Sequence, residues 1–145
     1  MNSPLRILVA TDGSEAAQHA VEWCAELGQT TGAEIVLMHT VSKVGEWLMS
    51  VAQIDFVKVE AERKDLLERV WAEPLRRAEV LHRTKFVTGD PVQTIIATAD
   101  AEDADMIVIG KVGHSGVGGS FLGGSAARIS QHTNRPLVLV PGPKG

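Results

Sequence analysis

The chain has 145 residues, of which 44% are hydrophobic and 22% charged, and its formal net charge is −4. This length supports one hydrophobic core and is short for two ordinary domains, so residues 1–145 are expected to form a single domain. The acidic balance argues against nucleic acid or an anionic membrane as the main partner, because it supplies no broad positive field. No apolar run approaches the roughly 20 residues that a transmembrane helix needs.

Two features of the sequence bear on the compartment. The first residues lead directly into a strand pattern and leave no room for a signal peptide. Cys24 is the single cysteine, and one cysteine forms no internal disulfide, which agrees with a reducing compartment. We expect a cytoplasmic protein without membrane insertion.

Five short runs rich in apolar and β-branched residues predict strands. They cover residues 7–10, 34–38, 85–87, 106–109 and 137–140, the third being the weakest. Most of them are continuous in apolar residues and do not alternate, which is typical of strands buried on both faces of a parallel sheet.

Helical periodicity separates these strands. Apolar residues between Ala17 and Gly28 follow the spacing of one helix face, and Ser14 stands where it can cap that helix. A second such pattern runs from Val92 to Ala99. Strands that alternate with helices predict an α/β fold, a doubly wound parallel sheet with helices on both faces.

Two further stretches are helix-prone. Residues 51–81 are charged, and Pro74 should kink or break a helix there. Their apolar stripe consists of Leu66, Leu67, Val70 and Trp71. A short last helix is expected from about Gly124 to His132.

Residues 42–50 are harder to assign, because Val44, Trp47, Leu48 and Met49 lie among polar residues. This segment could be a lid, a surface for a partner or a cover for the core. We favour the cover.

Glycine is concentrated in residues 110–125, where it supplies seven of sixteen residues, against 14 in the whole chain. Backbone N–H groups in such a segment can converge on an anion, because no Cβ obstructs the approach. The segment also runs into the last predicted helix, whose free N–H groups favour a phosphate. Composition alone leaves a second interpretation open, a surface loop without a ligand.

The position of this segment favours the phosphate site. Ligands of doubly wound sheets bind at the carboxyl ends of the strands, where the strand order reverses. Gly110 closes the fourth predicted strand, and Asp12 follows the first. We expect both to lie at that edge of the sheet. A carboxylate would repel a phosphate, so Asp12 is expected to serve either the turn or the base and ribose of a nucleotide.

Several motifs resemble those of the universal stress protein family. Gly110-x-x-Gly113, followed after nine residues by Gly123, resembles the family's ATP-binding pattern. The other matching segments are residues 9–14, 89–91, 101–110 and 135–140. The match covers nearly the whole chain in order, and only residues 42–83 are generic.

The resemblance implies a fold and a ligand. The fold is a five-stranded sheet of order 3-2-1-4-5, like that of the adenine nucleotide alpha hydrolases. The ligand is ATP, which Mg²⁺ can accompany, held mainly by phosphates and water. The implied nucleotide-binding residues are Ala10, Thr11, Asp12, Thr40, Ile109, Gly110, Gly113, His114, Gly116, Gly123, Gly124 and Ser125. His39 is expected to be a hydrogen-bonded structural histidine.

The resemblance also implies a regulatory or stress-response homodimer. Its interface would be the last strand, formed by Leu137, Val138, Leu139 and Val140, because an exposed strand edge can pair with its mate. ATP hydrolysis or autophosphorylation is expected to be slow at most, since no residue stands out as a base that activates water. The histidines and the cysteine show no metal-ligand spacing.

One position departs from the family pattern. The family places Ser or Thr directly after the third glycine, whereas this chain has Gly124 there and Ser125 one step later. An interaction module that does not bind ATP, or that prefers AMP or cyclic AMP, therefore stays open. Two other classes find no support. An adenylating enzyme would need a Ser-Gly-Gly-x-Asp-Ser type of loop after the first strand, and a phospho-acceptor domain would need an aspartate at the end of the third.

Overall fold

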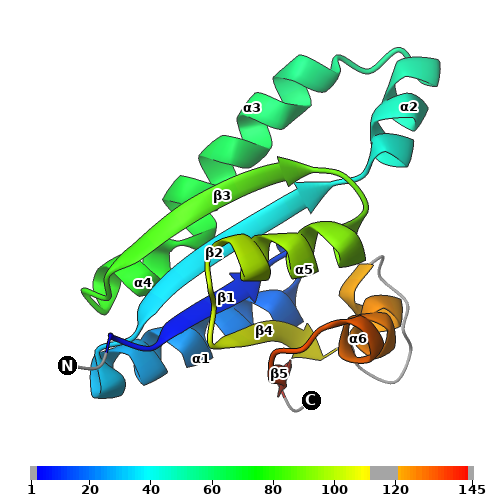
Figure 1. The fold of residues 1–145 in the computed structure, drawn as a ribbon. Helices are drawn as coiled ribbons and strands as arrows, with labels where there is room; N and C mark the ends of the chain where they lie inside the picture. Colours follow the sequence, from blue (N-terminus) through cyan, green and yellow to red (C-terminus); the bar gives the residue numbers. More distant parts are fainter. Residues whose placement is uncertain (1–2, 112–120, 144–145) are drawn as a thin grey trace.

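Five parallel strands form one sheet in the order β3-β2-β1-β4-β5, which confirms the expected fold (Figure 1). The computed structural model describes residues 3–111 and 121–143, and only the backbone of residues 121–123. The strands are β1 (Arg6–Ala10), β2 (Glu34–Val41), β3 (His82–Thr88), β4 (Met106–Lys111) and β5 (Leu137–Pro141). Each predicted run lies within one of these strands.

Helices cover both faces of the sheet (Figure 1). The helical segments are α1 (Glu15–Thr31), α2 (Lys43–Val51), α3 (Phe56–Leu66), the π-helical turn η1 (Leu67–Trp71), α4 (Glu73–Arg77), α5 (Pro91–Ala101) and α6 (Phe121–His132). α1, η1 and α4 pack on one face of the sheet, and α5 and α6 pack on the other.

The central strand β1 divides the core between the two faces. Ile7 and Val9 are fully buried against α1, whereas Leu8 is fully buried on the face that α5 and α6 cover. Both faces are therefore apolar, as the continuous run of hydrophobic residues predicted.

Helix α1 begins and ends where its sequence signals lie. Ser14 Oγ accepts a hydrogen bond from the Ala17 N–H at 3.2 Å, a side-chain cap that satisfies one free donor of the first turn. At the other end Gly32 adopts φ 75°, the left-handed conformation that glycine adopts most easily.

Residues 56–77, which follow α2 and precede β3, are divided into α3, η1 and α4. Pro74 lies in the first turn of α4, directly after the break, which confirms its predicted role. Leu67 is buried, but Val70 is 43% exposed, so the predicted apolar stripe is wrong at that position. The reason is the π-helical turn, which has more residues per turn than an α-helix and shifts the side chains that follow out of phase.

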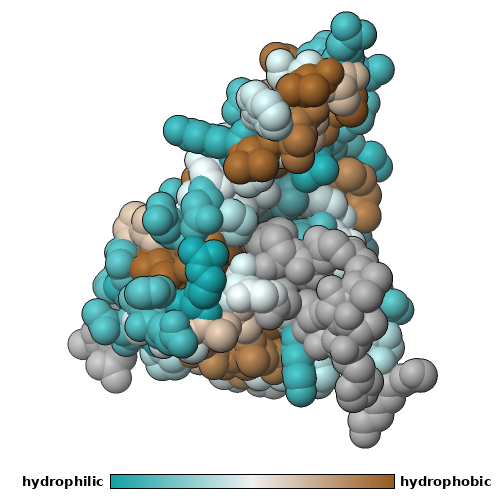
Figure 2. Space-filling view, turned by 90° about the vertical axis from the view of Figure 1, so that its right-hand side faces the viewer, coloured by the Kyte–Doolittle hydropathy of each residue, from teal (hydrophilic) through white to brown (hydrophobic). Residues whose placement is uncertain are grey.

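Helix α2 does not cover the core, so the favoured interpretation of residues 42–50 is wrong. None of its residues is buried, and Trp47 is 63% exposed. Figure 2 shows the hydrophobic patch that results at the upper end of the molecule. Its residues, on α2, the beginning of α3 and the connection between them, are Val44, Trp47, Leu48, Val51, Ile54 and Val57.

The last helix, α6, begins at Phe121, three residues before the predicted start at Gly124. Gly123 and Gly124 therefore belong to the first turn and do not precede the helix. Because the first four N–H groups of a helix have no acceptor within it, Gly123 and Gly124 keep such donors, whereas Ser125 does not.

Candidate functional site

The carboxyl ends of β1, β2 and β4 form one edge of the sheet, at the point where the strand order reverses. Ala10 ends β1 opposite Met38 of β2, and Val9 lies opposite Val108 of β4. The Thr11 N–H extends the pairing with a 2.9 Å hydrogen bond to the Met38 carbonyl. The structure thus brings Thr11, Asp12 and Thr40 to the edge at which β4 also ends, with Ile109 and Gly110.

The turn after β1 is stabilised by two hydrogen bonds between its own side chains and backbone. Thr11 Oγ1 accepts from the Gly13 N–H at 3.0 Å, and Asp12 Oδ1 accepts from the Ser14 N–H at 2.9 Å. Gly13 has φ 80°, and a Cβ there would lie 2.5 Å from the Trp71 ring. One Asp12 oxygen therefore stabilises the turn, which is one of the two roles expected for this residue.

Gly110 has a packing function that is independent of any ligand. A Cβ built on it would lie 2.6 Å from the backbone carbonyl of Ala16 in α1. Because backbone atoms cannot swing aside as a flexible side chain can, only glycine lets β4 end this close to α1.

The predicted phosphate-binding residues are described in part. Gly113, His114 and Gly116 lie outside the described residues. Gly124 is exposed, and a Cβ placed on it would have no atom of the described residues within 4 Å, whereas Ser125 is buried. As far as residues 3–111 and 121–143 go, the first turn of α6 therefore has room for a side chain at residue 124.

A hollow of about 180 Å³ opens at the carboxyl end of β2. Its lining residues are Thr40, Val41, Ser42, Gly45, Met49, Arg63 and Pro91. Thr40 is 4% exposed, and its Oγ1 has no hydrogen-bond partner among the described residues. Buried hydroxyl groups are normally paired, so an unpaired hydroxyl on a residue beside a hollow favours a polar ligand or a water at this place.

His39 lies beneath this edge, on the face of the sheet that α1 covers. Its Nδ1 is 2.8 Å from the Thr11 carbonyl and its Nε2 is 3.4 Å from Arg63 Nη1. A carbonyl can only accept and a guanidinium can only donate, so Nδ1 carries the proton and Nε2 accepts. His39 is thus the hydrogen-bonded structural histidine that the sequence predicted.

The surroundings keep His39 uncharged. Burial lowers its pKa from the ordinary value of 6.5; the Thr11 carbonyl opposes this effect, the Arg63 guanidinium adds to it, and Asp12 opposes it again. The rings of Trp71 and Phe86 lie 5.0 and 5.6 Å from the His39 ring, centroid to centroid.

Arg63 is a residue of this edge that sequence reasoning missed. It lies in the generic part of the chain, and its approach to β2 depends on the path of α3, which no local pattern encodes. The only signal was a cation on a helix whose other basic residues have acidic neighbours four positions away, such as Lys64 with Glu60.

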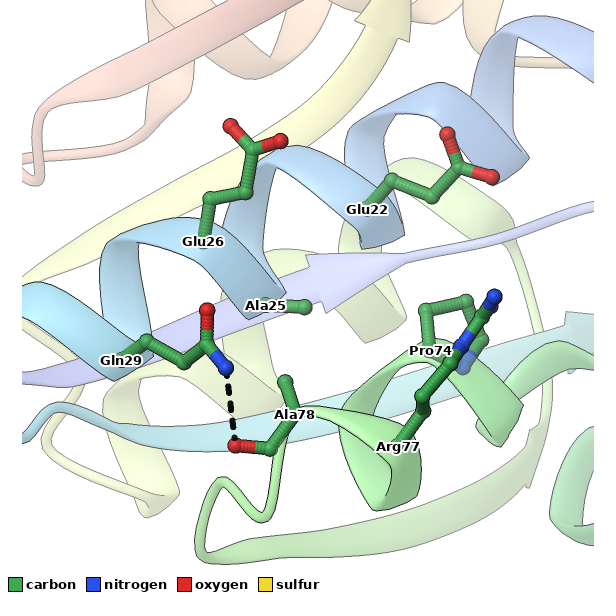
Figure 3. Close-up of a pocket in the computed structure, with 7 residues that line it drawn as sticks. All are labelled: Glu22, Ala25, Glu26, Gln29, Pro74, Arg77 and Ala78. Carbon is green, nitrogen blue, oxygen red and sulfur yellow. Dashed lines mark hydrogen bonds between the residues drawn. The ribbon is translucent and has the colours of Figure 1, made fainter.

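Two hollows with more than twice the volume of the hollow at β2 lie away from this edge. One, of about 440 Å³, is a surface groove between α1 and α4, where Gln29 Nε2 donates to the Ala78 carbonyl at 3.3 Å (Figure 3). The other, of about 420 Å³, lies between α5 and α6. Neither is lined by a predicted site residue. Within residues 3–111 and 121–143, no group of acidic, histidine or cysteine side chains could hold a metal ion, and no helix could cross a membrane.

The chain has a doubly wound α/β fold, and its strand order reverses at this edge, which is where proteins of such folds commonly bind their ligands. The sequence profile of the Universal stress protein family matches residues 5–141, so the chain belongs to that family. A universal stress protein of Thermus aquaticus is 30% identical over 135 residues, which cover 92% of this chain and 96% of the relative. The chain spans about half, 48%, of the longer Mycobacterium tuberculosis protein Rv2623, at 28% identity.

Solved structures share the fold. The hypothetical protein MJ0577 superposes with a TM-score of 0.76 at 23% identity, covering 97% of this chain and 98% of its own. A universal stress protein in complex with cAMP gives 0.68 at 20% identity and covers 96% and 98%. The Archaeoglobus fulgidus protein in complex with dAMP gives 0.67 at 18% identity and covers 94% and 97%.

Proposed function

We propose that this chain binds an adenine nucleotide, in the first place ATP, at the carboxyl edge of β1, β2 and β4. The observation that carries the proposal is the hollow at the end of β2, which is lined by Thr40, a buried residue whose hydroxyl has no hydrogen-bond partner among the described residues. Two structures of the same fold were solved with cAMP and with dAMP. A buried hydroxyl has already lost its hydrogen bonds to water, so a ligand that hydrogen-bonds to it gains free energy of binding.

The residues at this edge fit the two ends of a nucleotide. Thr40 and the turn at Thr11 and Asp12 would hold the base and ribose by hydrogen bonds. The N–H groups of Gly123 and Gly124 would meet the phosphates, because the first turn of a helix favours anions. Mg²⁺ would enter with the phosphates and keep most of its water ligands.

The protein would act as a regulator and not as a fast enzyme, because the bound nucleotide would change its conformation or its assembly. A cytoplasmic location agrees with its single cysteine, which is buried. Any hydrolysis or autophosphorylation would be slow.

A second candidate is a preference for a monophosphate such as AMP or cyclic AMP. Gly124 favours it, because this position offers no hydroxyl for a polyphosphate. The ligands of the two structural neighbours, cAMP and dAMP, are also monophosphates.

Nucleotide analysis tests both candidates. The purified protein is denatured, the released nucleotide is identified, and fresh protein is titrated with ATP, AMP and cyclic AMP by calorimetry. We expect ATP to bind, and a Gly113→Val variant to lose most of that affinity. Tighter binding of a monophosphate would favour the second candidate, and no binding at all would contradict both.

The proposed homodimer would form through β5, which lies at the edge of the sheet and pairs with β4 alone among the described strands. Leu139 is 42% exposed there. Analytical ultracentrifugation should find a dimer, and Leu139→Lys should shift it toward monomer. A monomeric wild-type protein at micromolar concentration would contradict the interface.

A further inference from the structure

The hydrophobic patch on α2 and the beginning of α3 is a concentrated feature of the surface (Figure 2). Nine large hydrophobic side chains are exposed in the described part of the chain, and six of them lie within residues 44–57. These six are between 49% and 74% exposed. Exposed apolar residues that stand singly are normal in folded proteins, whereas a group of large ones in one place marks an interaction surface.

The part of the patch on α2 follows the period of a helix. Val44, Trp47, Leu48 and Val51 have the spacing i, i+3, i+4 and i+7, so they lie on one face of α2, here called the α2 stripe. A helix of a globular protein normally turns such a face toward the core, yet no residue of α2 is buried. The α2 stripe is therefore an apolar helix face that the described part of the chain does not cover.

The charges around the α2 stripe are balanced. Residues 43–58 contain two bases, Lys43 and Lys58, and two acids, Glu46 and Asp55, so their net charge is zero. None of the four forms an ion pair with another described residue. A two-fold axis sets one surface against its own copy, so that surface must attract itself. A balanced patch can pair its acids with the bases of the copy, whereas a patch of one sign would repel its copy.

The same balance argues against two other occupants of the patch. Helices that lie on membranes carry many Lys and Arg residues on their polar face, and this segment has as many acids as bases. A strongly acidic or basic protein partner would find no opposite field here to attract it. A second copy of the chain needs neither.

We propose that the α2 stripe pairs with the α2 stripe of a second copy of this chain, around a two-fold axis. Trp47 lies in the middle of the stripe, and tryptophan is enriched among the residues that carry most of the binding energy of interfaces. Figure 1 shows α2 and β5 at opposite ends of the molecule. The α2 interface is therefore separate from the proposed β5 interface, and the two together would join dimers into a larger assembly.

The pairing through α2 should be weak. A standard interface buries about 800 Å² on each partner, whereas α2 has nine residues and is only about 14 Å long. Ile54 and Val57 extend the apolar surface beyond the helix. An interface of this kind belongs to the small, transient class, so α2 should be unpaired at micromolar concentration and should pair when the protein is concentrated.

The first test measures self-association in Leu139→Lys, a background in which the proposed β5 interface is weakened. Sedimentation velocity is recorded from roughly 10 μM to 1 mM, the range in which a weak interface associates. The Leu139→Lys protein should pass from monomer to dimer. Adding Trp47→Ser together with Leu48→Ser should abolish that dimer. Adding Leu81→Ser instead is the control, because Leu81 is 69% exposed and lies outside the patch, and it should leave the dimer unchanged.

The outcome is independent of the nucleotide site, because no nucleotide is added, and of β5, because all variants share the same background. Circular dichroism verifies that each variant folds. A Leu139→Lys protein that stays monomeric at the highest concentration would overturn the inference, and so would a dimer that survives both substitutions on α2. Equal loss of the dimer in the Leu81→Ser control would overturn it as well, because the association would then not depend on the patch.

The second test asks whether the α2 stripes themselves meet. Cysteine is placed in turn at Val44, Leu48 and Val51, again with Leu139→Lys, and the protein is oxidised at high concentration. A two-fold axis through the stripe brings one of these positions against its own copy, so at least one variant should form a disulfide-linked dimer on a non-reducing gel. Cys24 should not compete, because it is buried and burial raises the pKa of its thiol to about 12.

Leu81→Cys is the matched control for this cross-linking, since it offers an equally exposed thiol outside the patch. It should remain a monomer under the same oxidation. No cross-link at any of the three stripe positions, or an equal cross-link in Leu81→Cys, would contradict the pairing of α2 with its copy. Vesicles of phosphatidylcholine and phosphatidylglycerol should not bind the protein, and binding that requires Trp47 without self-association would identify a membrane as the occupant and overturn the inference.

Discussion

At the scale of single residues, the edge of the sheet is defined by groups that are already committed and groups that are not. Thr11 Oγ1, one oxygen of Asp12 and both nitrogens of His39 have protein partners. Thr40 Oγ1 has none among the described residues. This difference separates residues that build the edge from a residue that is free to bind a ligand.

The buried, uncharged His39 should make stability depend on pH. Its pKa is lower in the folded chain than the ordinary 6.5, so the unfolded chain takes up a proton first. Stability is therefore full above pH 6.5 and falls as the pH decreases toward the folded pKa. Urea unfolding from pH 8 to 5 should show this fall, and His39→Asn should reduce it. An identical pH dependence in both proteins would contradict the assignment.

Cys24 should be chemically inert in the folded protein. Burial raises the pKa of its thiol to about 12, and the thiolate is the reactive form. Ellman's reagent should therefore react slowly in buffer and fully, with one thiol per chain, in denaturant. Rapid reaction of the native protein at pH 8 would mean that Cys24 is accessible.

Two glycines should respond in opposite directions to the same substitution. Gly110→Ala places a Cβ 2.6 Å from the Ala16 backbone, and such overpacking costs about 1–3 kcal/mol of unfolding free energy. Gly124→Ala meets no atom of the described residues within 4 Å and lies in a helix, where alanine is favoured over glycine by up to about 1 kcal/mol. Urea unfolding checks both, and equal effects would contradict the close approach of β4 to α1.

At the scale of elements, α2 contrasts with α4. Trp47 is 63% exposed on α2, whereas Leu75 of α4 is fully buried. Trp47→Ser should change the unfolding free energy by no more than about 0.5 kcal/mol. Leu75→Ala should cost about 2–5 kcal/mol. A large loss in Trp47→Ser would mean that α2 packs on the core after all.

The strands and α1 could be predicted because their signals are local. Continuous β-branched runs define β1 and β4, and Ser14 and Gly32 stand at the two ends of α1. The exposure of Val70 could not be predicted, because it depends on the π-helical turn and on its packing. The same holds for α2. Its apolar residues are typical of a buried segment, but composition does not say where the helix lies in the fold.

At the scale of the whole molecule, the candidate site combines segments from across the chain. β1, β2 and β4 supply its floor, while α3 and α6 supply groups at either end. The sequence predicted the floor, because strand ends follow from the strand order. It did not predict Arg63, since the contact with β2 arises only once α3 is placed.

The central claim is that an adenine nucleotide binds at this edge, and amide chemical shifts of the ¹⁵N-labelled protein test it most directly. Addition of ATP should shift the amides of residues 11–13, 40–42 and 123–125, and leave Ala25, Gln29 and Ala78 of the groove in Figure 3 unchanged. Shifts confined to that groove, or no shifts with millimolar ATP, would contradict the account.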